Sequence, residues 1–190
     1  MADNLAYQEE DWEELLDGEV VLMSPRPRID HNRIVLNIAN SLKNQIEGTG
    51  KPCETFVDGT DVYLGEKDRV IPDVMIICKK EIIREDGIHG APSLIVEILS
   101  PSTRKRDKGY KKDLYERYGV LEYWIVSPTE RTVEVYLLED GQYRLDEVYE
   151  LPSGYDSLDK EERKIYKTVI PVSLYDDVFV PLKSMFRNVT

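Results

Sequence analysis

Apolar residues recur at two different spacings along this chain, and the two spacings predict different elements. From residue 30 to residue 46 they recur every four positions, at Ile34, Ile38, Leu42 and Ile46. This is the period of one face of an α-helix. Asp30 is a candidate N-cap for this helix, and Gly48 and Gly50 follow its end.

Nearly continuous apolar runs elsewhere predict strands that are buried on both faces. We expect such strands over residues 70–78, 93–99 and 121–126, and further strands over residues 19–23, 52–57 and 60–64. A second helix is expected over residues 107–118, with Gly119 as its terminating residue. Two alternating segments, 132–138 and 142–151, flank Asp140-Gly141, and this dipeptide predicts a β-hairpin.

The two ends of the chain carry weaker patterns, which predict a short acidic helix over residues 5–18, a polar loop over 152–167 and one or two short strands over 168–186. The stretch Val169–Leu174 is expected either to complete the sheet or to line a dimer interface. The 190 residues suffice for one sizeable core and not for two. The elements together predict one mixed-sheet α/β domain over residues 1–190 with an added hairpin.

Asp73 and Glu97 each stand alone inside an apolar run, the first in Val70–Ile77 and the second in Leu94–Leu99. A buried carboxylate is costly unless a cation or hydrogen-bond donors compensate its charge. Taken singly, Asp73 is explained equally well by a turn hydrogen bond and Glu97 by a structural ion pair. Two carboxylates on neighbouring strands instead form a site for a hard divalent cation, and we favour this interpretation.

Helical phase identifies the lysine that faces these strands. Residues three and four apart are neighbours on a helix, so one face of the second helix carries Asp107, Lys111, Leu114, Tyr115 and Tyr118. Lys111 is therefore expected to point towards the carboxylates, although a lysine at a domain edge can also extend to solvent.

A basic run, Arg104-Lys105-Arg106, precedes the second helix. Such residues can position a phosphate backbone, although a charge run is usually just a solvated face. The chain as a whole has a net charge of -12, which argues against a nucleic-acid ligand because DNA binding relies on Lys and Arg. Part of the acidic excess lies away from the predicted site, near the N-terminus and in the polar loop.

Cys53 and Cys78 are the two cysteines, and we expect them to be free thiols in a reducing compartment. No apolar run approaches the roughly 20 residues of a membrane helix. The first ten residues lack the basic and apolar regions of a signal peptide, so a cytoplasmic protein without membrane partners is expected.

Several segments carry a resemblance to a known family: Pro72-Asp73-Val74, Glu97–Thr103, Asp107–Lys111 and Tyr115–Trp124, together with Glu14–Glu19, Met23-Ser24-Pro25 and His31 near the start. They resemble the Uma2 family, a group of bacterial restriction-endonuclease-like proteins. The resemblance covers roughly residues 12–128, and it is most specific between Glu97 and Trp124.

The resemblance implies the PD-(D/E)XK nuclease fold, which has a restriction-endonuclease-like αβββαβ core with a mixed sheet flanked by helices. The core would span about residues 12–128 and a β-rich C-terminal extension about 129–190. Asp73 and Glu97 would then hold Mg²⁺ or Mn²⁺ with the backbone carbonyl of Ile98.

The resemblance also assigns the catalytic lysine. Two residues after the glutamate, where the lysine of this fold usually stands, the chain has Leu99, and the resemblance places the lysine at Lys111 instead. Glu19, His31 and Asp107 are accessory candidates; Glu19 is preferred to Glu14 because it opens an apolar strand.

Three functions remain open from the sequence. A homodimer is a candidate assembly. The first function is a metal-dependent endonuclease that hydrolyses phosphodiester bonds of DNA. The second is a protein of the same fold that no longer cuts and serves as a binding or scaffold subunit, which Leu99 and the acidic charge favour. The third is a metal-dependent hydrolase of a smaller phosphate substrate.

Overall fold

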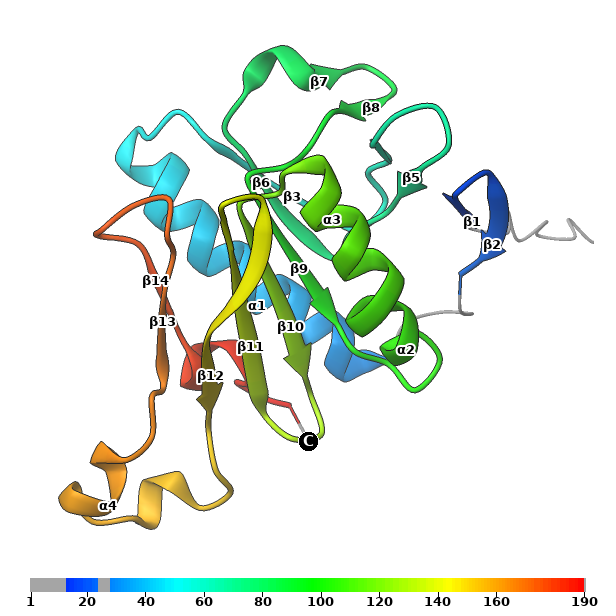
Figure 1. Cartoon of the computed structure of the whole chain (residues 1–190). Coiled ribbons are helices and arrows are strands. Elements are labelled where there is room, and N and C mark those ends of the chain that lie inside the picture. The colour runs from blue at the N-terminus through cyan, green and yellow to red at the C-terminus, as the bar shows by residue number, and fades with distance from the viewer. Residues whose placement is uncertain (1–12, 24–27, 190) are drawn as a thin grey trace, which may run out of the picture.

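The computed structural model describes residues 13–23 and 28–189, and its centre is a six-stranded mixed sheet (Figure 1). The strand order is β12-β11-β10-β9-β6-β3. Neighbours β9 and β10 run parallel, and the other neighbouring pairs of this sheet are antiparallel. Its strands are β3 (Glu54–Val57), β6 (Val74–Ile77), β9 (Leu94–Ile98), β10 (Glu122–Ser127), β11 (Thr132–Glu139) and β12 (Gln142–Glu150).

Helices cover both faces of this main sheet. The long helix α1 (Ile29–Ile46) lies on one face, in a buried cluster that includes Val96 of β9. Helix α3 (Lys112–Tyr118) lies on the other face, in a cluster that includes Ile95. Because successive residues of a strand point to opposite faces, a strand covered on both sides needs apolar residues at nearly every position. This requirement explains the continuous runs that predicted the strands.

The chain reaches α3 through a short helical turn, α2 (Arg104–Arg106), and a π-helical segment, Asp107–Lys111. A π-turn is wider than an α-turn and often occurs at functional sites. Gly119 follows α3 with a φ of 80°, a left-handed conformation that glycine adopts without steric cost. The predicted end of the second helix is therefore confirmed.

A second, smaller sheet has the order β2-β1-β5-β4-β8-β7. Several of its apolar side chains, including Leu16, Val62 and Ile88, belong to the buried cluster on the α3 side of the main sheet. Its strands are β1 (Glu13–Leu16), β2 (Glu19–Leu22), β4 (Val62–Tyr63), β5 (Arg69–Val70), β7 (Ile83–Arg84) and β8 (Gly87–His89). Short 3₁₀ turns occur at Glu47–Thr49, Lys80–Ile82 and Tyr155–Ser157.

The C-terminal part of the chain packs on α1. The predicted hairpin is confirmed as β11 and β12, which extend the main sheet beyond β10. Strands β13 (Val169–Pro171) and β14 (Phe179–Pro181) form a separate two-stranded sheet, followed by α5 (Leu182–Met185). Val169–Leu174 therefore does not complete the main sheet, and its role in a dimer stays a prediction.

The acidic helix predicted over residues 5–18 is wrong where it can be compared. Glu13–Leu16 form β1, paired antiparallel with β2, and residues 5–12 lie outside the described residues. Strand alternation explains the error, because Glu14 and Leu16 are buried while their neighbours in β1 are only half-buried.

Two further boundaries differ from the prediction. Asp30 lies in the first turn of α1, whose N-cap is Arg28. The predicted loop 152–167 contains α4 (Lys160–Lys164), which begins at Asp159 with a capping box. The Asp159 carboxylate accepts hydrogen bonds from two backbone amides of this helix, and this local pairing supports a helix in an otherwise polar stretch.

The prediction of free cysteine thiols is also wrong, because Cys53 and Cys78 form a disulfide. Strands β3 and β6 are antiparallel, and Glu54 lies opposite Ile77. The next pair along this register is Cys53 and Cys78, so strand pairing brings together two residues that are 25 positions apart. Among the described residues, no helix is both long and apolar enough to cross a membrane.

Candidate active site

Asp73 and Glu97 are brought together by the pairing of β6 with β9. Asp73 immediately precedes β6, and Glu97 lies in β9, next to the Val74–Val96 pair of this register. The backbone amide of Ile98 donates a hydrogen bond of 2.5 Å to Oδ2 of Asp73. Both residues are buried, with 8% of Asp73 and 4% of Glu97 exposed, so their charges interact in a medium that screens them weakly.

Lys111 lies against the strands, in the direction that helical phase predicts. Its Nζ is 3.0 Å from Oε1 of Glu97 and 2.7 Å from Oε1 of Glu14, and 3% of the residue is exposed. The hydroxyl of Tyr115, from the next helical turn, donates a 2.6 Å hydrogen bond to the same Oε1 of Glu97. One oxygen of Glu97 therefore accepts from both a lysine and a tyrosine.

The charges around Lys111 determine its protonation. Burial alone would lower the pKa of Lys111, but the nearby carboxylates of Glu97, Glu14 and Asp107 outweigh burial and raise this pKa. Burial raises the pKa of Glu97 well above its usual range, and the ammonium of Lys111 opposes this shift. Lys111 is consequently a fixed cation at neutral pH, shared by two carboxylates.

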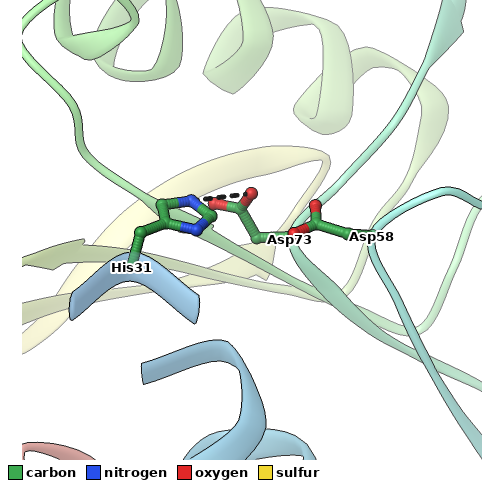
Figure 2. A group of neighbouring side chains, drawn as sticks. All are labelled: His31, Asp58 and Asp73. Carbon is green, nitrogen blue, oxygen red and sulfur yellow. Dashed lines mark ion pairs between the residues drawn. The ribbon is translucent and has the colours of Figure 1, made fainter. Parts of the chain in front are cut away.

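Asp73 also faces a second group of side chains, shown in Figure 2. Nε2 of His31, in the first turn of α1, lies 3.1 Å from Oδ1 of Asp73. Asp58 follows β3, and its backbone amide donates to the backbone carbonyl of Asp73. One ligand atom from each of His31, Asp58 and Asp73 lies within 4.8 Å of the others.

The pKa values in this second group follow from burial and from the close carboxylates. Burial, and then the charge of Asp73, raises the pKa of Asp58 to about 7. Burial lowers the pKa of His31, but the hydrogen bond and charge of Asp73 outweigh burial and raise it overall. Two carboxylates and one imidazole thus share a partly buried space.

Asp107 lies in the π-helical segment and is 2% exposed. Within residues 13–23 and 28–189, its Oδ1 has no hydrogen-bond partner. Burial raises the pKa of Asp107 to about 6, and the charge of Lys111 opposes the shift. Its backbone carbonyl accepts a 3.0 Å hydrogen bond from the hydroxyl of Tyr123, which anchors the segment to β10.

The three basic residues predicted to bind phosphate differ in their surroundings. Arg104 is exposed and pairs with Glu130 at 3.2 Å, and Arg106 lies 3.5 Å from Oε2 of Glu14. Lys105 is exposed and has no ion-pair partner among the described residues. Arg106 therefore adds a cation to the Glu14 side of the site, while Lys105 is available to an external anion.

One accessory residue predicted from the sequence lies away from the site, the lower-ranked Glu14 lies in it, and Asp58 was not predicted. Glu19 is exposed on β2, opposite Leu16, and the carboxylate that this hairpin contributes to the site is that of Glu14. Alternation along β1 would have identified Glu14 had this segment been assigned as a strand. Asp58 gave no signal, because Asp58-Gly59 has the composition of an ordinary turn.

Comparison with known proteins gives a family and a fold. The sequence model of the Uma2 family, described as "Putative restriction endonuclease", matches residues 3–162. The chain is 27% identical over 129 residues to the uncharacterized protein slr1290 of Synechocystis sp., covering 67% of this chain and 66% of that protein, just under two thirds of its length. It is 29% identical over 140 residues to the uncharacterized protein sll1609 of the same organism, covering 71% and 77%.

The fold also matches a solved structure. The crystal structure of a "putative nuclease belonging to DUF820" from Anabaena variabilis superposes with a TM-score of 0.69 at 20% identity. The match covers 93% of this chain and 90% of that chain. The predicted mixed-sheet α/β fold with flanking helices is therefore confirmed.

Proposed function

Because the chain belongs to the Uma2 family, whose description is that of a restriction endonuclease, we propose that it is a metal-dependent endonuclease that hydrolyses phosphodiester bonds of DNA. The observation that carries this proposal is the buried arrangement of Asp73, Glu97 and Lys111. Two carboxylates on adjacent strands with a lysine 3.0 Å from one of them are the charged groups that metal-assisted phosphodiester hydrolysis requires.

The proposed metal ligands are the carboxylates of Asp73 and Glu97 with the backbone carbonyl of Ile98. These oxygen donors suit Mg²⁺ and Mn²⁺. Lys111 is already shared by Glu97 and Glu14. The negative charge of Asp73 is therefore left for a divalent cation to balance. When bound, such a metal would lower the pKa of a water molecule and neutralise charge on the phosphoryl oxygens.

Lys111 would act as a fixed positive charge. Its raised pKa means that it does not accept a proton from water at neutral pH. A preorganised cation in a buried site stabilises charge that develops in the transition state. Leu99, at the position where the lysine of this fold usually stands, is instead packed in the apolar cluster beneath α3.

The expected partners remain part of this proposal. Lys105, together with Arg104 and Arg106, would position the DNA backbone at the start of α2. Homodimer formation and a cytoplasmic location stay predictions from the sequence.

A second candidate, hydrolysis of a smaller phosphate substrate, is favoured by the ion pairs of the basic segment, defined as residues 104–117. Five of its cations pair with carboxylates of this chain: Arg104, Arg106, Lys108, Lys111 and Arg117. Each pair reduces the positive charge available to a duplex. The non-cutting scaffold is the third candidate, and the absence of any metal-dependent cleavage would favour it.

Plasmid nicking in Mg²⁺ or Mn²⁺ tests the proposal. Glu97→Gln and Lys111→Met each remove a charge at nearly constant volume, and we expect each to lower the nicking rate by about 100-fold or more. The matched controls Glu161→Gln and Lys164→Met change an exposed ion pair of α4 and should leave the rate unchanged. Equal rates in all five proteins would show that the cleavage does not arise at this site.

A small chromogenic phosphodiester, tested with the same variants, separates the first two candidates. Cleavage of this compound without plasmid nicking, lost in Glu97→Gln, would favour the small-substrate hydrolase over the nuclease.

A further inference from the structure

His31, Asp58 and Asp73 come from three different elements and meet at one end of the main sheet. Figure 2 shows the Asp73 carboxylate between the imidazole of His31 and the carboxylate of Asp58. His31 belongs to the first turn of α1, Asp58 follows β3, and Asp73 precedes β6. Because β3 and β6 are paired, the positions of the two aspartates are fixed by the same strand register.

The spacing of these donors fits a single bound cation. In octahedral coordination with bonds of about 2.1 Å, adjacent donors are about 3.0 Å apart and opposite donors about 4.2 Å. Nε2 of His31 and Oδ1 of Asp73 are 3.1 Å apart, and the full set lies within 4.8 Å.

The two oxygens of Asp73 have separate surroundings. Oδ2 accepts the hydrogen bond from the amide of Ile98, while Oδ1 faces His31. On the Glu97 side, Oε1 is already occupied by Lys111 and Tyr115. The atoms around Asp73 that can still bind a metal ion therefore lie mainly on the side of His31 and Asp58.

The charge of the buried cluster independently points to a cation. Lys111 and Arg106 are both engaged with Glu14, and Lys111 also with Glu97. Asp107, one of the carboxylates whose charge acts on Lys111, is 2% exposed, and its Oδ1 has no hydrogen-bond partner among the described residues. Buried carboxylates without enough partners are costly, and proteins commonly balance them with a metal ion.

We propose that His31, Asp58 and Asp73 form a mixed nitrogen and oxygen cation site that prefers Mn²⁺ to Mg²⁺. Imidazole is a good ligand for first-row transition metals, whereas Mg²⁺ favours carboxylates, carbonyls and water. This inference rests on the proposed function, because it specifies the ligands and the metal of the same site. It adds Asp58 and His31 to the donors and gives Asp73 the central position.

Metal binding, measured without any substrate, tests this assignment. Isothermal titration should show that Mn²⁺ binds at least about tenfold more tightly than Mg²⁺. His31→Ala should weaken Mn²⁺ binding by about tenfold or more and reduce the preference for Mn²⁺, while Asp58→Asn should weaken binding of both ions. His89→Ala is the matched control, because His89 pairs with Asp86 and stacks on Tyr63, and it should bind like the wild type.

Pulsed electron paramagnetic resonance of Mn²⁺ on the wild-type protein adds a test that needs no variant. Modulation from a ¹⁴N nucleus is expected if His31 is a ligand, and its loss in His31→Ala but not in His89→Ala would assign the nitrogen. Bound Mn²⁺ without ¹⁴N modulation, with equal affinities in both histidine variants, would show that His31 and Asp73 form only an ion pair. That result would overturn this inference and leave the nuclease proposal intact.

The remaining outcomes separate the two proposals. Mn²⁺ bound through His31 in a protein that nicks no DNA would support this site and contradict the nuclease. A wild-type protein that binds neither ion at millimolar concentration would overturn both.

Discussion

Asp107 is a buried carboxyl group whose charge is unfavourable in the folded protein. Its pKa is raised to about 6, mainly by burial. In the unfolded chain the pKa of the same group is about 3.9. Between about pH 4 and 6 the folded state therefore keeps a proton that the unfolded state has lost. Stability should fall as pH rises through this window, by at most about 3 kcal/mol from this residue.

We expect Asp107→Asn to remove this part of the pH dependence. The free energy of unfolding of the metal-free protein, measured by denaturant titration in EDTA at pH 4.5 and pH 7, should differ less in the variant than in the wild type. Asp140→Asn, whose side chain is 95% exposed in a turn, is the control and should behave like the wild type. An unchanged difference in Asp107→Asn would mean that Asp107 is already ionised at pH 4.5.

The residues of the site were predictable to the extent that their sequence context was unusual. Asp73 and Glu97 interrupt apolar runs, and Lys111 lies in phase with the apolar side of its helix, so simple periodicity indicated all three. Asp58 and Glu14 are positioned by strand pairing with distant segments. Pairing of this kind involves distant segments of the chain, so Asp58 was not predicted and Glu14 was ranked below Glu19.

At the scale of elements, the segment from α2 to α3 contains two glycines with opposite requirements. Gly109, in the π-helical segment, has no left-handed φ, and a methyl group there would contact nothing within 4 Å. Gly119 is equally open but has a φ of 80°. Gly109→Ala should stabilise the protein by about 0.5–1 kcal/mol, while Gly119→Ala should destabilise it by about 1–2 kcal/mol.

Each alanine variant is the control for the other, because space is available at both positions and only the backbone conformation differs. Unfolding in urea, with unchanged slopes of free energy against urea concentration, would measure the two effects. Destabilisation by Gly109→Ala would contradict this account and show that the π-turn itself needs the conformational freedom of glycine.

Elements were predicted best where one strong local signal decided them. The recurrence of apolar residues every four positions predicted α1, and Asp140-Gly141 predicted the hairpin of β11 and β12. The acidic segment before Gly18 was assigned wrongly, since its short alternation of buried and half-buried residues indicates a strand only once β1 is paired with β2. The Cys53–Cys78 disulfide was missed for a related reason, because it depends on the register of β3 against β6.

At the scale of the whole molecule, a net charge of -12 has to be reconciled with the proposed substrate, DNA, which is a polyanion. The cations of the basic segment are mostly engaged with carboxylates of the same chain. Lys105 has no ion-pair partner among the described residues, and Lys112 lies 3.9 Å from the centre of the Tyr136 ring. These two lysines are the residues of the segment that can contact phosphates without first breaking an ion pair.

DNA binding should consequently depend only weakly on salt. With about two phosphates neutralised, the expected slope of log K against log salt concentration is about -2, and Lys105→Ala should reduce it to about -1. Fluorescence anisotropy with a labelled duplex, in EDTA to prevent cleavage, measures both slopes. Lys164→Ala on α4 is the control and should keep the wild-type slope.

A slope of about -4 or steeper would contradict this expectation. It would mean that Arg104, Arg106 or Lys108 leaves its carboxylate partner when DNA binds. Because Arg106 pairs with Glu14, and Glu14 also pairs with Lys111, such an exchange would change the charge beside Lys111 when DNA binds. The salt slope therefore tests whether substrate binding and the charge state of the site are independent or coupled.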